Sequence, residues 1–422
     1  MQTEVVNPHF YPEGQGLLPV HISAMNPIDA PRPPGLPVGY VLNAFPVLSE
    51  TFVSNEIRAM RAQGHIVTPL ALGGFDGPCQ PDDECFKPEI VAIGEISHLA
   101  AAGLALTSRG LSRAADFAFR QKGIRPRSLM LAGARVAVAA RRRGITHLHA
   151  HFAHSAAATA IVAARLGGMT SSFIGHGYDV YGAPCDLALK LASADVAFGT
   201  CQDMIRDFQG LAPLARLRQI NCGIDPARFH RPAEVQRNGR MLAIGRLAEQ
   251  KGYPVLLAAL AALPSDRRPV IDIVGGGDLL ASLQEVAATL GVSDCVNFLG
   301  PKPSGWIAEH GPAYIGFLAP YCLTSTGDRD TGPLVVKEAM AMELPVVASA
   351  LMGLKEAITP ETGMLVPPAN PAALASGLLW LAKLSEQDRR TIGRAGRAHV
   401  IANYTIDGQA LGLARAIADL QA

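Results

Sequence analysis

The amino-acid sequence predicts two doubly wound α/β domains with a ligand cleft between them. Short apolar runs of strand type alternate with alanine-rich helical stretches from Val38 onward, the rhythm of a parallel sheet covered by helices. That rhythm breaks at residues 225–239, a polar segment that contains prolines, and then starts again. With 422 residues, the chain is long enough for two or three domains of ordinary size.

Residues 36–230 are expected to form the first domain, after an irregular, proline-rich arm at residues 1–35. Its expected strands are GYVLNAF, IVTPLAL, THLHAHF, SSFIGHG, VAFGT and RQINCG. Residues 231–405, the expected second domain, repeat the pattern with MLAIGRL, PVIDIVGG, CVNFLG, YIGFLAP, PVVASA and GMLVPP. Helices are expected between these strands at residues 253–263, 279–290, 333–342 and 371–383. Residues 406–422 are expected to form a last helix, a candidate for crossing back to the first domain.

The composition argues against several classes of protein. The net charge of +1 gives no overall field that would recruit nucleic acid or a membrane, so either role needs a local patch. Seven scattered cysteines, an odd number without a CxxC pair, argue against a disulfide scaffold. No run of about 18 uncharged apolar residues occurs, and the N-terminus has no apolar signal region. We expect a cytoplasmic protein, with peripheral attachment to the inner face of the cell membrane left open.

An acidic pair stands at a predicted helix start. Asp330 lies on a polar loop just ahead of a helix expected to begin at Pro333, and Glu338 lies in its second turn. A helix N-terminus attracts anions, and a carboxylate inside the helix can accept hydrogen bonds from the hydroxyls of a ribose. Taken alone, an ordinary N-terminal acid and a surface glutamate explain this segment at least as well.

Two further loops follow predicted strands of the second domain. Arg246 and Lys251, five residues apart, can clamp a diphosphate, although a solvated basic loop is an equal alternative. Residues 275–277 are three contiguous glycines at a strand end, where the backbone can approach a ligand closely. A dinucleotide-binding GxGxxG motif does not fit this spacing, and by itself the segment reads as a tight turn.

Taken together and in this order, these features resemble the retaining glycosyltransferases of family 4, the glycosyl transferases group 1, which have the GT-B fold of two Rossmann-like domains. The resemblance covers about residues 38–420. It rests on the acid-x7-Glu element, the Gly-Arg and Lys-Gly loop, the triple glycine and the closing GMLVPP at residues 363–368. FPVLSETF at 45–52, HAHF at 149–152 and GHGYDVY at 175–181 look like the exopolysaccharide subgroup of colanic-acid and amylovoran type.

The resemblance implies a role for each matching residue. His176 and Asp330 are expected to be catalytic, beside the donor sugar. Glu338 is expected to bind the ribose of the donor. The donor diphosphate is expected to contact Arg246, Lys251, Leu334 and Val335. The residues expected to line the cleft for donor and acceptor are Ser49, Glu50, Thr51, His151, Asp179, Gly275, Gly276, Thr331 and Gly332.

Thr331 departs from the family pattern, which usually has glycine directly after the acid. Its side chain is expected either to crowd the sugar or to mark a turn shifted by one residue. His149 and His151 alternate on one strand face, but a metal site needs three or four ligands, and no acid or cysteine lies at a suitable local spacing. We therefore expect no metal and read these histidines as structural, with His151 as a candidate cleft residue.

Residues 109–143 hold ten lysines and arginines against the single acid Asp116, interleaved with apolar residues. Basic amphipathic helices attach to anionic lipid surfaces, and a solvated helical face is the alternative. Nucleic acid is not favoured, because no aromatic platform interleaves the patch.

The predicted reaction is transfer of a hexosyl-type unit, with retention and without a metal or other cofactor, from a nucleoside diphosphate sugar to a hydroxyl of a lipid-linked or polysaccharide-precursor acceptor. UDP is favoured as the nucleotide, and GDP stays open. The alternatives are a non-catalytic sugar-nucleotide-binding protein, a sugar-nucleotide epimerase of the same fold, and an NAD enzyme, which would lack its fingerprint at the first strand.

Overall fold

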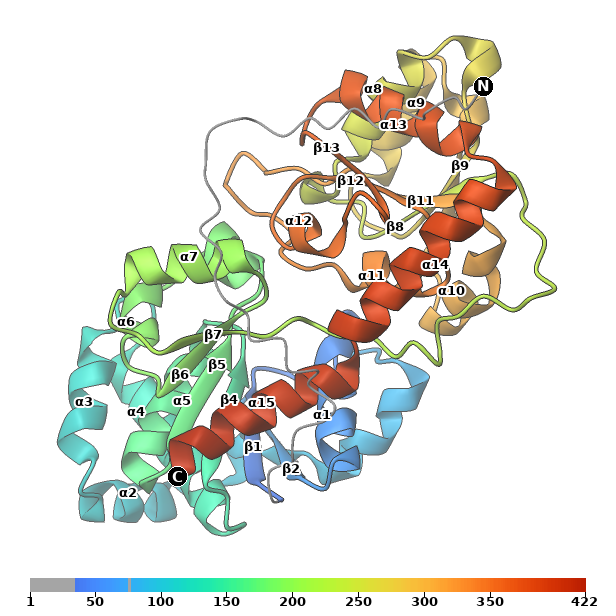
Figure 1. The fold of residues 1–422 in the computed structure, drawn as a ribbon. Coiled ribbons are helices and arrows are strands. Elements are labelled where there is room, and N and C mark those ends of the chain that lie inside the picture. The colour runs from blue at the N-terminus through green and yellow to red at the C-terminus, as the bar shows by residue number, and fades with distance from the viewer. Residues whose placement is uncertain (1–34, 75–76) are drawn as a thin grey trace.

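The computed structural model describes residues 35–74 and 77–422, and the arm predicted for residues 1–35 lies outside them except for its last residue. Within the described ranges, the chain forms a seven-stranded and a six-stranded sheet, and all strand pairs in both are parallel. Helices cover both sheets (Figure 1). The prediction of two doubly wound domains is confirmed.

The first sheet has the strand order β3-β2-β1-β4-β5-β6-β7. Its strands are β1 (Pro37–Leu42), β2 (Ile66–Ala71), β3 (Val91–Ala92), β4 (His147–His151), β5 (Thr170–Ile174), β6 (Val196–Gly199) and β7 (Leu217–Gln219). Its helices are α1 (Thr51–Ala62), α2 (His98–Thr107), α3 (Leu111–Arg120), α4 (Pro126–Arg141), α5 (Ser155–Gly167), α6 (Leu187–Leu191) and α7 (Gln202–Leu211). The alanine-rich helix α5 is buried and packs closely on α4, because small side chains let the two backbones approach.

The second sheet has the strand order β10-β9-β8-β11-β12-β13. Its strands are β8 (Met241–Ile244), β9 (Ile271–Val274), β10 (Val296–Gly300), β11 (Gly316–Ala319), β12 (Val346–Ser349) and β13 (Gly363–Val366). The helices that follow β8 are α8 (Tyr253–Ala261), α9 (Leu280–Thr289), α10 (Ser304–His310), α11 (Leu334–Ala341), α12 (Leu354–Ala357), α13 (Pro371–Lys383), α14 (Glu386–Asn403) and α15 (Ile406–Gln421). β8 and β11 lie at the centre and are buried along their whole length, as parallel strands covered on both faces must be.

Two helices of the second half differ from the sequence expectation. Helix α11 begins at Leu334, with Pro333 as its N-cap in extended conformation. Helix α14 is not among the helices predicted from the sequence, because its charged residues and internal glycines hide the apolar period. One of these glycines, Gly393, is required by packing: a Cβ there would lie 2.3 Å from the carbonyl oxygen of Glu343.

The chain crosses between the sheets twice, and the two crossings are hydrogen-bonded to each other. Ile224 donates its N–H to the carbonyl of Tyr404 (2.8 Å) and accepts from the N–H of Ile406 (3.0 Å). After the second crossing, α15 packs on α1, and its apolar face completes the core of the first sheet (Figure 1). The linker at 225–239 contains no helix or strand. No helix within residues 35–74 and 77–422 is long and apolar enough to cross a bilayer.

Candidate active site

The predicted site residues gather where strands of the two sheets end. His176 follows β5, and residues 49–51 lead into α1 after β1. From the second sheet, Arg246 follows β8, Gly275 follows β9 and Asp330 follows β11. In doubly wound folds ligands bind beyond these carboxyl ends, so the topology brings the predicted residues toward one junction between the domains.

Lys251 and Asp330 form an ion pair at this junction, with 2.7 Å between Nζ and Oδ2. The lysine ammonium also lies 4.2 Å from the ring centre of Tyr321. Burial by itself would lower the pKa of Lys251, but Asp330 and Tyr321 outweigh it and raise this pKa above its ordinary value. The lysine therefore stays charged and is partly neutralised by the acid predicted to be catalytic.

Arg246 is the second predicted cation. It is exposed, and it forms no ion pair within the part of the chain that the structure describes. The loops after β8 and β9 touch here, since a Cβ on Gly275 would lie 1.9 Å from the carbonyl oxygen of Gly245. Only glycine fits at position 275, whereas a Cβ on Gly276 would first meet Pro301 at 3.6 Å.

Glu338 lines a cavity of about 250 Å³ between the two domains. The cavity lies between the start of α1, the 3-10 helix η1 (Pro81–Glu89), the interdomain linker and α11. Its lining residues are Thr51, Asn55, Arg58, Gln80, Asp82, Asp83, Ile224, Asp225, Arg228, Phe229, Ser304 and Glu338. Burial raises the pKa of Glu338 to about 7, although Arg228 acts in the opposite direction.

The neighbours of Glu338 within α11 point in different directions. Leu334 and Val335 form the first turn, which no side chain caps, so that turn is open to an anion. Lys337 is buried instead and donates to the carbonyl of Cys222 (2.7 Å). A larger cavity of about 700 Å³ near the start of β5 and β6 contains none of the predicted site residues.

Thr331, which was expected to line the cleft, lies buried at the junction between the domains. The residue is only 5% exposed, and its Oγ1 lies 3.0 Å from Oγ1 of Thr200, at the end of β6 in the first domain. The side chain turns into the junction because a buried hydroxyl needs a partner, and Thr200 supplies one. The next residue, Gly332, is half-buried.

Asp179 was also expected in the cleft, and it is 1% exposed. One oxygen of its carboxylate accepts the N–H of Ala153 at 2.6 Å, and the N–H of His176 lies 3.0 and 3.2 Å from the two oxygens. Burial raises the pKa of Asp179, although these N–H groups lower it. The aspartate is thus a buried acceptor that holds the backbone at His176.

His176 lies beside the loop that carries Asp330. A Cβ on the next residue, Gly177, would stand 2.5 Å from the carbonyl oxygen of Arg329, so the two loops are in contact. Phe52 and Phe152 flank the His176 ring, with ring centres 4.6 and 4.7 Å away. Burial, followed by the neighbouring His151, holds the pKa of His176 well below its ordinary value, so the ring is neutral.

The loop before α1 borders the same region. Ser49 is exposed, while Glu50, the N-cap of α1, and Thr51 are half-buried. Burial raises the pKa of Glu50, and His151 lowers it. Glu50 therefore lies within electrostatic reach of the histidines.

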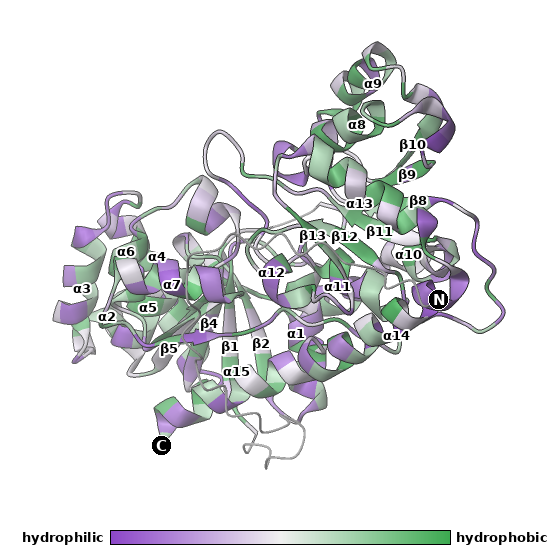
Figure 2. Cartoon of the chain, turned by 45° about the horizontal axis from the view of Figure 1, so that its top comes forward, coloured by the Kyte–Doolittle hydropathy of each residue, from purple (hydrophilic) through white to green (hydrophobic). Residues whose placement is uncertain are grey.

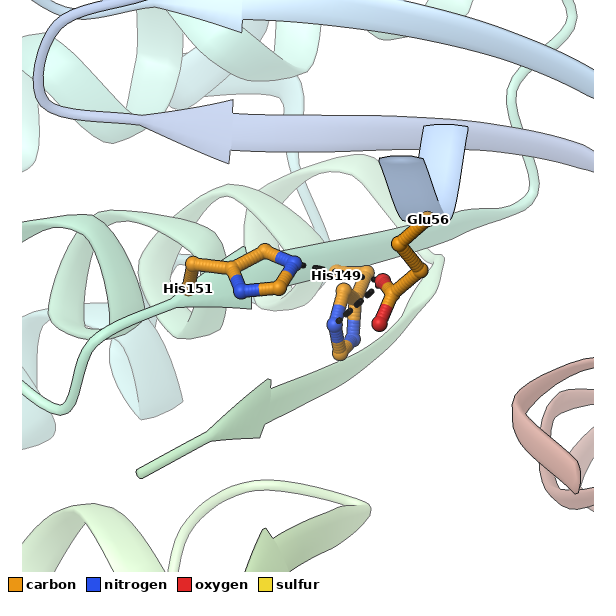
Figure 3. A group of neighbouring side chains, drawn as sticks. All are labelled: Glu56, His149 and His151. Atoms are coloured by element: carbon orange, nitrogen blue, oxygen red, sulfur yellow. Dashed lines mark hydrogen bonds and ion pairs between the residues drawn. The ribbon is translucent and has the colours of Figure 1, made fainter. Parts of the chain in front are cut away.

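Glu56 is the functional candidate that sequence reasoning missed. It is 1% exposed and reaches from α1 toward His149 and His151 on β4 (Figure 3). Its Oε1 lies 2.8 Å from the hydroxyl of Tyr40, 3.2 Å from Nε2 of His151 and 3.6 Å from Nε2 of His149. One sequence signal could have found it: Glu56 interrupts the apolar stripe of α1 formed by Val53, Ile57 and Met60.

The histidines on β4 are buried, and among them is His151, which was expected to line the cleft. No acid lies near them along β4, and the neighbouring carboxylate, that of Glu56, comes from α1. One carboxylate oxygen of Glu56, one ring nitrogen of His149 and one ring nitrogen of His151 all lie within 4.8 Å of one another. Burial opposes ionisation of Glu56, but His151, His149 and Tyr40 lower its pKa to about 2, so the carboxylate is ionised.

Comparison of the chain with known proteins identifies its family. Residues 238–383 match the family described as glycosyl transferases group 1. The amylovoran biosynthesis glycosyltransferase AmsK of Erwinia amylovora is 33% identical over 192 residues, which span 44% of this chain and only 47% of that relative. A GDP-mannose-dependent alpha-(1-6)-phosphatidylinositol monomannoside mannosyltransferase of Mycobacterium tuberculosis is 30% identical over 332 residues, 71% of this chain and 84% of that protein.

Among solved structures, that of Anabaena HepE in complex with UDP matches with a TM-score of 0.69. The match covers 91% of this chain and 100% of that one at 15% identity, which shows a common fold. Together with the relative matched over 84% of its length, the two parallel sheets confirm the resemblance seen in the sequence. The chain belongs to the glycosyl transferases group 1 family and is a glycosyltransferase with the GT-B fold.

Proposed function

We propose that this glycosyltransferase moves a hexosyl unit from a nucleoside diphosphate sugar to a hydroxyl of a lipid-linked or polysaccharide-precursor acceptor, with retention of the anomeric configuration. The observation that carries the proposal is the ion pair of Lys251 with Asp330, which lies on the loop just ahead of the uncapped first turn of α11, the helix that carries Glu338. A cation, a helix N-terminus and a half-buried carboxylate together match a diphosphate followed by a ribose. A UDP-sugar is the favoured donor, and the GDP-mannose-dependent relative makes a GDP-sugar the second candidate.

The difficult event is cleavage of the anomeric C–O bond while negative charge builds on the departing diphosphate. Arg246, Lys251 and the first N–H groups of α11 would hold that charge, which is the task a divalent cation performs in other enzymes. This supports a metal-independent reaction. The attacking hydroxyl arrives on the face from which the diphosphate leaves, and a diphosphate oxygen takes its proton.

His176 would contact the donor sugar from the first domain, and Asp330 from the second. Their loops already touch through Gly177 and Arg329, so both reach a sugar bound at the junction. The aromatic rings around His176 exclude water from that side, which limits hydrolysis of the donor.

Binding of nucleotide sugars tests the proposal most directly. A donor stabilises the folded state by mass action, by about 2.7 kcal/mol at a concentration 100 times its Kd. We expect thermal shifts with one UDP- or GDP-sugar and not with NAD, and an acceptor-dependent product whose anomeric configuration NMR shows to be retained. Binding without turnover across acceptors would indicate a non-catalytic protein, product without acceptor an epimerase, and an inverted anomer would refute retention.

We also propose that the outer helices of the first domain attach to an anionic membrane. Nine of the ten cations in residues 109–143 are exposed, the exception being Arg135. Large apolar side chains stand exposed beside them: Leu99 (85%), Leu106 (78%) and Phe119 (71%). Helix α3 lies at the end of the first domain farthest from the second sheet, with hydrophilic residues on its outward side (Figure 2). Cations with interspersed apolar residues are the combination that binds anionic lipid surfaces.

A further inference from the structure

We propose that Glu56 is a positioning residue that fixes the protonation pattern of His151 and, through it, of His176. The proposal rests on the proposed function, in which His176 contacts the donor sugar. Four side chains form a continuous chain of contacts from the C-terminal helix to the active site: Gln409 on α15, Glu56 on α1, His151 on β4 and His176 after β5. None of the four neighbours the next in sequence, so only the fold brings them together.

The first link follows from the charge on Glu56. An ionised carboxylate can only accept hydrogen bonds, so each of its partners must donate. Tyr40 donates its hydroxyl at 2.8 Å, and the side-chain amide of Gln409 donates to the other oxygen. His151 therefore carries a hydrogen on Nε2, which lies 3.2 Å from the carboxylate.

The second link sets the charge on His151. Within residues 35–74 and 77–422, His151 is the one ring of this cluster with a carboxylate oxygen within hydrogen-bond distance. His149 is 3.6 Å from Glu56, and the ring contact of His176 is with His151. Burial holds the pKa of His149 at about 3, and His176 is likewise neutral. One imidazolium beside one carboxylate gives the buried cluster no net charge, which lowers the free-energy cost of burying both ions.

The third link fixes His176. Nδ1 of His151 lies 3.2 Å from Nε2 of His176, and the two rings are nearly parallel, 15° apart. An imidazolium donates from both nitrogens, so Nε2 of the neutral His176 accepts, and its hydrogen is on Nδ1. His176 thus offers a hydrogen-bond donor to the donor sugar, and its orientation is held by Phe52 and Phe152.

This arrangement suits the reaction. Positive charge develops on the sugar as the diphosphate leaves, and an isolated imidazolium nearby would oppose it. Paired with Glu56, His151 sets the tautomer of His176 without adding net charge. A carboxylate that holds a histidine in one tautomer is an arrangement known from hydrolases, where its amide replacement is strongly harmful.

Gln409 connects this chain of contacts to the first crossing between the two domains. Its amide oxygen accepts the N–H of Gly223 at 2.7 Å, next to the crossing at Ile224, while its nitrogen donates to Glu56. Each end of the amide therefore has one fixed partner. Gln409 therefore links the orientation of Glu56 to Gly223, which lies beside the crossing at Ile224.

The variant Glu56→Gln tests the proposal, with Ser54→Ala as the matched control. Ser54 is equally buried on α1 and loses one hydrogen bond, to Asp83, while the cluster stays intact. We expect kcat to fall on the order of 10- to 100-fold in Glu56→Gln, with KM for the nucleotide sugar nearly unchanged. The control should keep its kcat. In the double variant Glu56→Gln, His176→Ala, kcat should be no lower than in His176→Ala alone, and a further fall would overturn the proposal.

Nitrogen-15 NMR of histidine-labelled wild-type protein and of Glu56→Gln reads the protonation states directly and needs no turnover. The expected spectrum has a doubly protonated His151 and the Nδ1–H tautomer of His176, both lost in Glu56→Gln. An Nε2–H tautomer of His176 in the wild type, or one zinc ion per chain found by elemental analysis of purified protein, would overturn the proposal. Absence of transfer with every donor would refute the proposed function instead, while the NMR result would still stand.

Discussion

Nζ of Lys251 and Oδ2 of Asp330 lie 2.7 Å apart, which places the predicted diphosphate ligand and the predicted catalytic acid in one ion pair. Their loops follow β8 and β11, neighbouring strands at the centre of the second sheet. An incoming diphosphate must therefore share the lysine with the aspartate. If Lys251 binds the donor as predicted, donor binding and the Asp330 ion pair are coupled through this one lysine.

Asp330→Asn should leave the Lys251 ammonium with no carboxylate at contact distance. We expect the free energy of unfolding to fall by about 2 kcal/mol, less than the ~3–5 kcal/mol of a fully buried pair, because both side chains keep some exposure. Added UDP should recover part of this loss, since its phosphates take the place of Asp330. Urea unfolding with and without UDP measures both effects, and Asp328→Asn is the control, since Asp328 forms no ion pair in the described residues.

Turnover of Asp330→Ala separates binding from catalysis. If Asp330 acts on the donor sugar, this variant should retain UDP binding and lose most of its kcat. A kcat equal to that of the wild type would show that the acid serves only the nucleotide site.

The affinity for the donor should depend on pH through Glu338. A ribose donates hydrogen bonds to the ionised carboxylate, and the pKa of this group is raised to about 7. Binding of a UDP-sugar, whose diphosphate does not titrate near neutrality, should therefore strengthen as the pH rises from 6 to 8. Isothermal titration calorimetry should show a flat profile for Glu338→Gln, and equal slopes for both proteins would contradict the assignment.

The same raised pKa affects stability with a definite sign. The carboxyl prefers its neutral form when folded, so its contribution is full below the unfolded pKa near 4.5 and is lost as the pH rises through about 7. Relative to Glu338→Gln, the unliganded wild type should lose about 1–3 kcal/mol of unfolding free energy across that interval. Denaturation midpoints at pH 4.5 and 7.5 measure the difference.

Thr331→Gly should change activity little, although it restores the usual family residue. The threonine hydroxyl bonds Thr200 in the buried junction, so its removal should cost about 1 kcal/mol of stability and leave kcat within about threefold of the wild type. A double-mutant cycle with Thr200→Val isolates the hydroxyl pair. A gain in kcat of tenfold or more would mean that the side chain does crowd the sugar.

Gly275→Ala and Gly276→Ala form a matched pair in the triple-glycine turn. A methyl group at 275 would collide with the carbonyl oxygen of Gly245, whereas one at 276 has room. We expect Gly275→Ala to lose about 1–3 kcal/mol of stability and to bind UDP poorly, with Gly276→Ala near the wild type in stability. Similar thermal midpoints for the two variants would show that the loops after β8 and β9 do not need this close approach.

Vesicle flotation tests the membrane surface. The wild type should float with anionic vesicles at low salt and less so at high salt, because the attraction is screened. Phe119→Ser combined with Arg120→Glu should weaken flotation. Leu214→Ser, which alters a fully exposed leucine outside residues 109–143, should not. Failure of the wild type to bind at low salt would exclude this surface.

The sequence predicted the features that depend on residues close together along the chain. Strand and helix rhythm located both sheets, since each element carries its own period, and the family motifs pointed to the loops after β5, β8, β9 and β11. It did not predict the direction of side chains at the junction. Thr331 and Asp179 were expected in the cleft and are buried, because their partners, Thr200 and the N–H groups of residues 153 and 176, come from elsewhere in the chain.

Glu56 was missed for the same reason, because its partners are also distant from it in the sequence. The search for an acid near the histidines considered only neighbours along β4, whereas the carboxylate comes from α1, 95 residues from His151. A lone acid within an apolar helical stripe is the pattern that identifies such a residue, because it must find donors once buried. Gln409, one of those donors, lies still farther away, on the last helix.

The position of α15 has a consequence for biosynthesis. Its apolar face belongs to the core of the first sheet, which also holds the strands made earliest. Chains leave the ribosome from the N-terminus, and domains generally fold in that order. Here the core of the first sheet cannot close until α15 has been made and released, so the second sheet can fold while the first still waits for this helix.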